Sequence, residues 1–160
     1  MIAKSNTEPK KVLLFNPTTP SYLVRWDVVE VEGGYDYQEK LFIGKPTLEQ
    51  VKDLIDSYYN KKCDEEIVSG YSYEGVPVWL SQENQLNFKA AFDLCLQLEG
   101  ATLPLKFKFG TNTKPVYKEF TNVEDLKAFY VDAITYIQST LHKYWDLKDA
   151  VNLDEYELPD

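Results

Sequence analysis

Apolar and polar positions along the chain repeat with two different periods, which predict strands and helices in turn. Between residues 22 and 43 apolar residues alternate with polar ones on both sides of Gly33-Gly34, the pattern of a β-hairpin. Within the first arm, Tyr22, Val24, Trp26 and Val28 share one face, whereas Val29 and Val31 lie on the other. Strict pleating does not permit such a change of face, so we predict a bulge, a strong twist or a change of partner strand near Val28. A short strand over residues 12–15 precedes this hairpin.

Two further segments have the alternating pattern of hairpins. Residues 67–80 form the first, with a tight turn at Glu74-Gly75 that places Tyr73 opposite Val76. Residues 103–120 form the second, in which leucine and phenylalanine alternate with lysine before the turn at 110–113.

A helix follows each predicted hairpin. The first begins at Thr47, which forms a capping-box pattern with Gln50, and ends at residues 60–62. The second runs from Ser81 to Gly100. The third begins after Thr121, which is spaced for a capping box with Glu124, and its apolar positions continue to Val151. Unbroken, this last helix would be roughly 45 Å long at ~1.5 Å per residue, so we expect it to bend or to project toward a neighbouring chain.

These elements predict an α+β fold in which three β-hairpins alternate with three amphipathic helices and an antiparallel sheet packs on the helices. We expect a mobile leader over residues 1–11, a single domain over residues 12–151 and an acidic tail over residues 152–160. Residues 22–66 and 67–151 are candidate sub-units of that domain.

The charge and the cysteine content restrict the partners. The formal net charge is −9, so we expect no nucleic-acid partner, and we expect the lysines at 106, 108, 114 and 118 to form a solvated sheet face. No apolar run approaches the ~20 residues of a membrane span, and no secretory signal opens the chain. We therefore expect a soluble protein with no membrane partner. Cys63 and Cys95 are not expected to form a disulfide framework, and Cys95 is expected to be a buried free thiol in a reducing compartment.

Candidate chemistry is sparse in this sequence. His142 is the single histidine, and nothing in the sequence places a nucleophile or further metal ligands beside it. Twenty-six acidic residues guarantee many carboxylate pairs, so the pairs alone do not indicate a glycosidase. The sequence therefore predicts no enzyme activity, no catalytic or metal-binding residues and no cofactor.

Aromatic residues are the one unusual excess, with 12 tyrosines, 8 phenylalanines and 3 tryptophans. Tyrosine suits contact surfaces, but it also suits the core of a strand-rich domain, and we favour the core. Trp79 with Pro77 is the preferred exposed patch, because the predicted register turns both away from Tyr71 and Tyr73. The candidate contact residues are Pro77, Trp79, Tyr144 and Trp145.

Several local features carry a resemblance to a known kind of domain. They are the opening Ile67-Val68-Ser69-Gly70-Tyr71, the turn at Gly75, Gln85 and Asn87 at the start of a helix, the hairpin 103–120, and the ending Lys148-Asp149-Ala150-Val151. With these features, residues 67–151 resemble an uncharacterised domain found in phage and prophage proteins, often near the C-terminus of tail-fibre or tail-assembly proteins. Residues 22–66 resemble the front half of longer prophage proteins of gut bacteria.

The resemblance implies a phage structural or tail-assembly protein. Such a protein would bind copies of itself or other virion and tail proteins, in the cytoplasm during assembly and then in the virion. Two other functions stay open from the residues alone. One is a carbohydrate- or receptor-binding module, suggested by the tyrosine content and Trp79. The other is a small hydrolase that acts through carboxylates.

Overall fold

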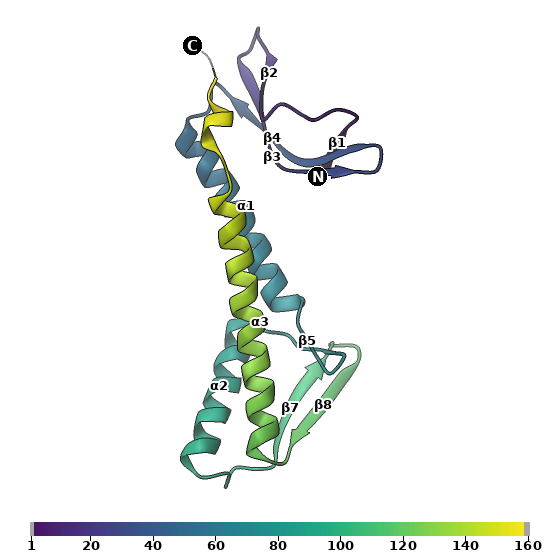
Figure 1. Ribbon diagram of the computed structural model, residues 1–160, viewed down its shortest axis with the longest axis vertical. Coiled ribbons are helices and arrows are strands. Elements are labelled where there is room, and N and C mark those ends of the chain that lie inside the picture. The colour runs from purple at the N-terminus through teal and green to yellow at the C-terminus, as the bar shows by residue number, and fades with distance from the viewer. Residues whose placement is uncertain (1, 159–160) are drawn as a thin grey trace. The chain divides into compact units, whose positions relative to one another are not determined.

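The structure is a computed structural model that describes residues 2–158, and it confirms the predicted α+β class (Figure 1). Three hairpins, β3–β4, β5–β6 and β7–β8, are each followed by a helix. The strands are β1 (Ile2–Ser5), β2 (Val12–Asn16), β3 (Ser21–Val31), β4 (Gly34–Ile43), β5 (Ser72–Tyr73), β6 (Val76–Pro77), β7 (Leu105–Gly110) and β8 (Pro115–Phe120). The helices are α1 (Leu48–Ser69), α2 (Gln82–Gln97), α3 (Val123–Asp149) and the 3-10 helix η1 (Leu153–Tyr156).

The described chain divides into two compact units. Unit 1 contains residues 2–59 and 148–158, and unit 2 contains residues 60–147. The sequence predicted a single domain over residues 12–151, with a finer division at residue 66. The observed division falls within α1 and α3 instead, because both long helices contribute residues to each unit.

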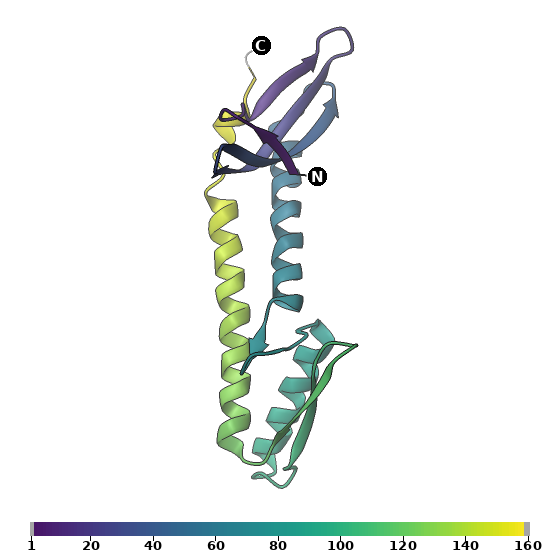
Figure 2. The same cartoon turned by 90° about the vertical axis from the view of Figure 1, so that its right-hand side faces the viewer.

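Unit 1 is built on a four-stranded antiparallel sheet with the order β1-β4-β3-β2 (Figure 2). Of the three alternatives predicted near Val28, the structure shows the bulge, because the β3–β4 register shifts between Trp26 and Val29 and Asp27 has a φ of 51°. Val24 and Trp26 are buried on one face of the sheet. There the Tyr58 ring meets Trp26 edge-on at 5.6 Å, and the Tyr58 hydroxyl donates to Asp27 Oδ2 at 2.6 Å.

The two ends of the chain are more ordered than the sequence predicted. Residues 2–5 form the edge strand β1, with Ala3 opposite Tyr37, so the prediction of a mobile leader is wrong for them. The predicted acidic tail contains η1, in which Tyr156 is buried and its hydroxyl donates to the Arg25 carbonyl at 2.9 Å. Strand pairing and ring burial offset the conformational entropy that these residues lose. Met1 and residues 159–160 lie outside the described residues.

Helix α1 is longer than predicted. Its capping box is confirmed, because Gln50 N donates to Thr47 Oγ1 at 3.1 Å and Thr47 N donates to Gln50 Oε1 at 2.9 Å. The predicted end at residues 60–62 is wrong, since the helix continues to Ser69. Its buried side chains recur every four residues through the predicted end: Val51, Ile55, Tyr59, Cys63 and Ile67.

The extension of α1 shortens the second hairpin. Residues 67–69 are helical and not part of a strand, and only Ser72–Tyr73 and Val76–Pro77 pair. The predicted register is confirmed for this remaining part, in which Tyr73 lies opposite Val76.

Unit 2 has an aromatic core supplied by α2, the hairpin β7–β8 and α3, which lie side by side in Figures 1 and 2. The Phe129 ring of α3 lies 5.2 Å from Phe88, 5.1 Å from Phe109 and 5.5 Å from Phe120, measured between centroids. Ser81 caps α2 as predicted, with its hydroxyl accepting from Asn84 N. The cap of α3 is Asn122 and not Thr121, because Asn122 Oδ1 accepts from Asp125 N at 2.8 Å.

Helix α3 is continuous over 27 residues, which is roughly 40 Å at ~1.5 Å per residue. Its C-terminal half packs within unit 2, where Thr140 and Tyr144 are buried and Tyr144 contacts Glu66 of α1. This part of the helix therefore buries its apolar face against its own chain, and the predicted projection toward a neighbouring chain is not needed to cover it.

Candidate functional site

The structure separates the four predicted contact residues. Pro77 is exposed, and Trp79 and Trp145 are 56% and 49% exposed. Tyr144 is only 7% exposed, so the prediction that it belongs to a contact surface is wrong. Its hydroxyl donates to Glu66 Oε2 of α1 at 2.6 Å, so the side chain points from α3 toward α1 and not toward solvent.

Glu66 is the centre of a polar network within unit 2. Lys143 Nζ lies 2.9 Å and 3.0 Å from the two carboxylate oxygens, and the Tyr136 hydroxyl donates to the Glu66 carbonyl at 2.7 Å. The hydrogen bond from Tyr144 is the main cause that lowers the pKa of Glu66 below its ordinary value. Every polar group here has a partner, so the network joins α1 to α3 and offers no open binding site.

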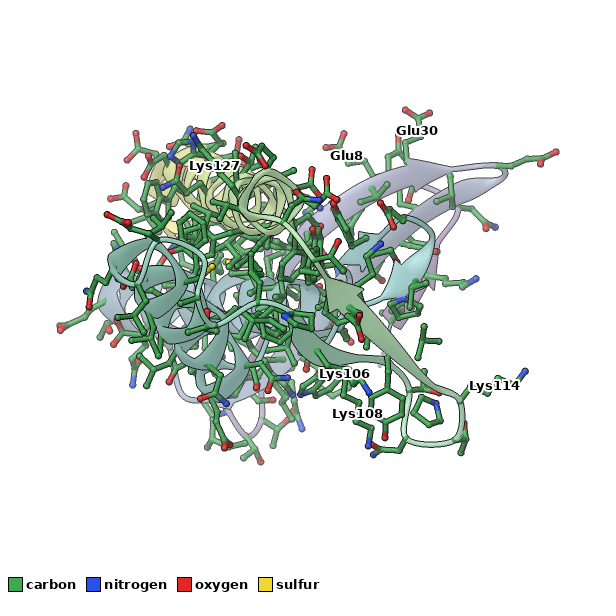
Figure 3. All side chains as sticks on the ribbon, turned by 90° about the horizontal axis from the view of Figure 1, so that it is seen from below. Glu8, Glu30, Lys106, Lys108, Lys114 and Lys127 are labelled. Atoms are coloured by element: carbon green, nitrogen blue, oxygen red, sulfur yellow. The ribbon has the colours of Figure 1, made fainter. Side chains whose placement is uncertain are left out.

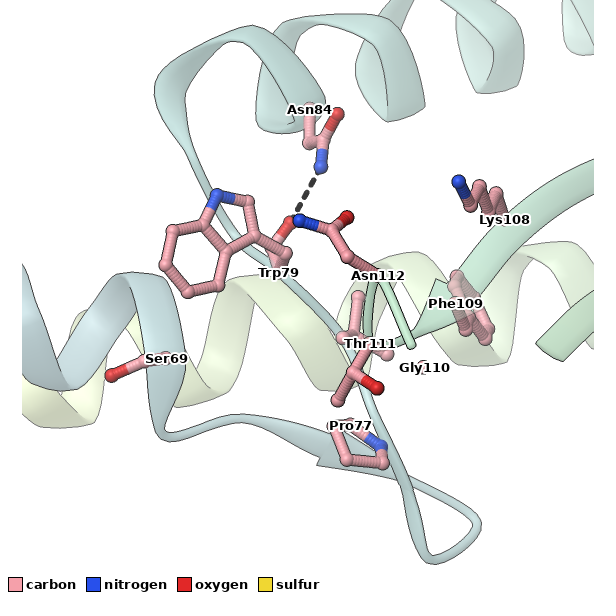
Figure 4. Close-up of a pocket in the computed structure, with 10 residues that line it drawn as sticks. Ser69, Pro77, Trp79, Asn84, Lys108, Phe109, Gly110, Thr111 and Asn112 are labelled. Carbon is pink, nitrogen blue, oxygen red and sulfur yellow. Dashed lines mark hydrogen bonds between the residues drawn. The ribbon is translucent and has the colours of Figure 1, made fainter. Parts of the chain in front are cut away.

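Trp79 and Pro77 line a cavity of about 550 Å³ in unit 2 (Figure 4). The other walls come from the end of α1, the start of α2 and the tip of the β7–β8 hairpin. The lining residues are Ser69, Pro77, Val78, Trp79, Asn84, Lys108, Phe109, Gly110, Thr111 and Asn112. A volume of this size lies within the usual range of small-molecule sites, roughly 300–1,000 Å³.

Local structure holds Trp79 in its exposed position. Val78 and Leu80 on either side are buried, so the extended chain turns Trp79 outward. Leu80 N donates to the Val68 carbonyl at 3.0 Å, and Asn84 Nδ2 donates to the Trp79 carbonyl at 2.8 Å (Figure 4). The indole therefore projects from a backbone that hydrogen bonds fix on both sides.

The hairpin tip opposite Trp79 requires a glycine. Gly110 has a φ of +80°, and a Cβ atom there would lie 2.3 Å from the Lys114 carbonyl oxygen. This turn places Thr111 and Asn112 at the mouth of the cavity. The sequence predicted the turn but gave no signal that it lies beside Trp79.

A second, smaller hollow of about 260 Å³ shares Trp79 and Ser69 with the first. Its other lining residues are Asp64, Glu65 and Val68 of α1. The indole is thus bordered by a larger hollow that includes amide and ammonium groups and by a smaller one whose surface is almost entirely apolar.

The four lysines of the β7–β8 hairpin do not form one solvated face. Lys106 and Lys108 point away from the hairpin on the same side, and Lys114 lies at its tip (Figure 3). Lys118 lies opposite Phe107 on the inner face and pairs with Glu74 at 2.7 Å, a hydrogen bond that raises the pKa of Lys118. The expected lysine face is therefore wrong for Lys118.

Unit 1 has an exposed apolar surface at one end of its sheet. We define the sheet-end patch as Leu14, Phe15, Leu41 and Ile43, which are 45%, 60%, 46% and 78% exposed. The strand register places these residues at the same end of the sheet but on both of its faces, because Leu14 pairs with Tyr22 and Tyr22 pairs with Phe42, whereas Leu41 and Ile43 point to the face opposite Phe42. The sequence signal for this patch was the run Val12–Phe15, which is apolar on both faces of a strand.

The remaining chemical groups are dispersed. Cys95 is a buried thiol outside any disulfide, as predicted, and Cys63 is buried as well. The His142 ring lies 5.1 Å from Trp145, both on α3. Within residues 2–158, no three His, Cys, Asp or Glu side chains are grouped to hold a metal ion. None of the helices described is long and apolar enough to cross a bilayer.

Comparison with known proteins gives a family but no activity. No curated protein and no solved structure matches the chain. One family, described as "Domain of unknown function (DUF4376)", matches residues 50–160. The match covers more than half of the chain and includes every residue that lines the cavity at Trp79. This chain therefore belongs to the DUF4376 family.

Proposed function

We propose that this chain is a non-enzymatic structural or assembly protein of phage or prophage tails. It acts by binding copies of itself or other tail proteins, in the cytoplasm during assembly and afterwards in the virion. The resemblance of residues 67–151 to a domain of tail proteins supports the phage setting. The observation that carries a role in protein contact is the sheet-end patch of unit 1.

The patch has the properties of a protein-binding surface. Its four side chains lie at the same end of β2 and β4, where Leu41 and Ile43 form an apolar pair on one face of the sheet and Leu14 lies on the other face. Contiguous exposed apolar patches on folded proteins mark interaction sites more often than single exposed residues do. Strand β2 is also an edge of the sheet, since β3 is its one partner among the described strands.

The proposal can be tested in the phage or lysogen that encodes the chain. Leu41 and Ile43 lie on the same face of β4, so Leu41→Lys with Ile43→Lys places two charges in the patch. The control is Val131→Lys, which charges an aliphatic residue that is 52% exposed on α3. We expect both variants to fold, as judged by circular dichroism, because all three positions are exposed.

Mass spectrometry of purified particles and assembly intermediates then gives the result. We expect the chain in wild-type and Val131→Lys preparations, and at least a tenfold reduction for the double variant. Absence of the wild-type chain from particles and from every intermediate would refute the tail role. Normal incorporation of the double variant would refute the role of the sheet-end patch.

A further inference from the structure

We propose that Trp79 is the platform of a binding site for a neutral oligosaccharide. Adjacent sugar units would occupy the two hollows that border the indole. This inference goes beyond the assembly role and does not depend on it, because the sheet-end patch lies in unit 1 and both hollows are lined by residues of unit 2.

The indole offers an accessible apolar surface that is held in place. Trp79 is 56% exposed, while its neighbours Val78 and Leu80 are 2% and 1% exposed. A pyranose ring has an apolar face of C–H groups, and an aromatic ring with a negatively polarised face attracts those groups. A fixed exposed indole can therefore bind a sugar ring without a large entropic cost for ordering the side chain.

The larger hollow supplies polar groups for sugar hydroxyls. Figure 4 shows the Asn112 amide between the Trp79 indole and the Lys108 ammonium in this view. No hydrogen bond or ion pair within the described part of the chain occupies the Asn112 amide or the Lys108 ammonium. The Asn112 amide offers both a donor and an acceptor, whereas the Thr111 hydroxyl already accepts from Lys114 N at 3.0 Å and shares a hydrogen bond with the Thr113 hydroxyl at 3.3 Å. Both donors and acceptors are thus available around one aromatic surface.

The smaller hollow supplies almost entirely apolar surface, although Asp64 and Glu65 of α1 are among the residues that border it. A sugar hydroxyl can both donate and accept, so a neutral oligosaccharide can form hydrogen bonds with Lys108 and Asn112 in the larger hollow and place the apolar face of a second ring in the smaller one.

Charge and strand geometry disfavour two other ligands. An anionic sugar would be repelled by a chain with a formal net charge of −9. An extended peptide that adds a strand beside β6 would meet Pro77, which has no backbone N–H to donate. The neutral saccharide avoids both conflicts.

The test begins with the purified full-length chain on a printed array of neutral and uronate oligosaccharides. The neutral probes are glucans, galactans, mannans and N-acetylhexosamine oligomers. The best neutral probe is then titrated against the ¹⁵N-labelled protein, in which each of the three tryptophans gives one indole N–H signal. We expect the Trp79 signal to shift and that of Trp26, which is 7% exposed, to remain in place.

Variants identify the residues that bind. Trp79→Ala is expected to weaken binding at least tenfold, and Asn112→Ala severalfold, without a loss of thermal stability because both side chains are exposed. The matched control is Trp145→Ala, since Trp145 is 49% exposed and lines neither hollow. Its affinity should equal that of the wild type.

Several results would overturn the proposal. They are silence of all neutral probes, binding of uronates alone, binding that Trp79→Ala leaves unchanged, and preference for a decaproline peptide over every sugar. Each of these outcomes leaves the tail role intact, because that role is tested by incorporation into particles through the sheet-end patch.

Discussion

Removing the hydroxyl of Tyr144 should show how much its hydrogen bond to Glu66 contributes to the stability of the contact between α1 and α3 within unit 2. The Tyr144 hydroxyl donates to Glu66 Oε2 at 2.6 Å, and the ring is 7% exposed. Tyr144→Phe removes this hydrogen bond and keeps the ring. Lys143 still pairs with the carboxylate at 2.9 Å, so Glu66 is not left without a partner.

The expected loss can be worked out from these contacts. A hydrogen bond to a charged group contributes roughly 1.5–3 kcal/mol to stability. The Glu66 side chain is 32% exposed, so water replaces part of the lost interaction. We therefore expect Tyr144→Phe to lower the free energy of unfolding at neutral pH by about 1.5 kcal/mol, at the lower end of that range.

The loss should depend on pH in a definite direction. The Tyr144 hydrogen bond lowers the pKa of Glu66 below its ordinary value of 4.5, so the ionised carboxylate stabilises the folded state. That contribution is fully present above pH 4.5 and is lost as the pH falls through the lowered pKa of the folded state. The difference in the free energy of unfolding between the wild type and Tyr144→Phe should therefore become smaller below pH 4.5.

Urea denaturation followed by circular dichroism, at about pH 7 and about pH 3.5, measures both quantities. A double-mutant cycle with Glu66→Gln isolates the pairwise energy. The matched control is Tyr117→Phe, which removes a hydroxyl from a residue that is 60% exposed and should change stability by less than ~0.5 kcal/mol. An equal loss at both pH values, or a coupling energy of zero, would refute the assigned role of Glu66.

Three further substitutions test the packing of unit 2, each by urea or thermal denaturation. Gly70→Ala would place a Cβ atom 2.5 Å from the Tyr136 hydroxyl, and it should destabilise the chain by about 1–3 kcal/mol; an unchanged stability would contradict that contact. Phe129→Ala removes the ring at the centre of the aromatic core, with an expected loss of about 3–5 kcal/mol. Asn122→Ala should cost about 1 kcal/mol and Thr121→Ala clearly less, and the reverse order would restore Thr121 as the cap of α3.

The order of hairpins and helices could be predicted because local residues determine it. The turn at Glu74-Gly75 uses two left-handed residues, with φ values of 50° and 78°, and such a turn sets the Tyr73–Val76 register by itself. The bulge at Asp27 was visible as a change of the apolar face. In each case the signal lies within a few residues of the structure that it specifies.

The end of α1 was mispredicted because local and longer-range signals disagree there. Asn60, Lys61 and Lys62 are typical of a helix C-terminus, where cations face the negative end of the helix dipole. Cys63 and Ile67 nevertheless continue the buried row of Tyr59 at four-residue spacing. Burial of these two side chains contributes more to stability than the terminal charges do, since each full burial contributes roughly 1.5–3 kcal/mol and each charge 0.3–1 kcal/mol.

The candidate contact residues show the same limit. The outward orientation of Trp79 could be predicted, because side chains alternate along an extended chain and its neighbours Val78 and Leu80 are buried. Tyr144 and Trp145 could not both lie on the same exposed face of α3, because consecutive helical residues point about 100° apart. The structure turns Tyr144 toward Glu66 and leaves Trp145 half exposed.

The residues that face Trp79 could not be found from the sequence, since the aromatic core brings them there. Phe109 is 3% exposed, its ring lies 5.1 Å from Phe129, and it also lines the cavity beside Trp79. Asn112 follows three residues later, at the tip of the same hairpin. The position of its amide therefore depends on how β7 packs against α3, a contact between segments about twenty residues apart, whereas the exposure of Trp79 depends on its immediate neighbours. In the proposed saccharide site, the local sequence pattern therefore determines the exposure of Trp79, whereas the packing of the core determines the position of Asn112. Only the exposure of Trp79 could be predicted from the sequence.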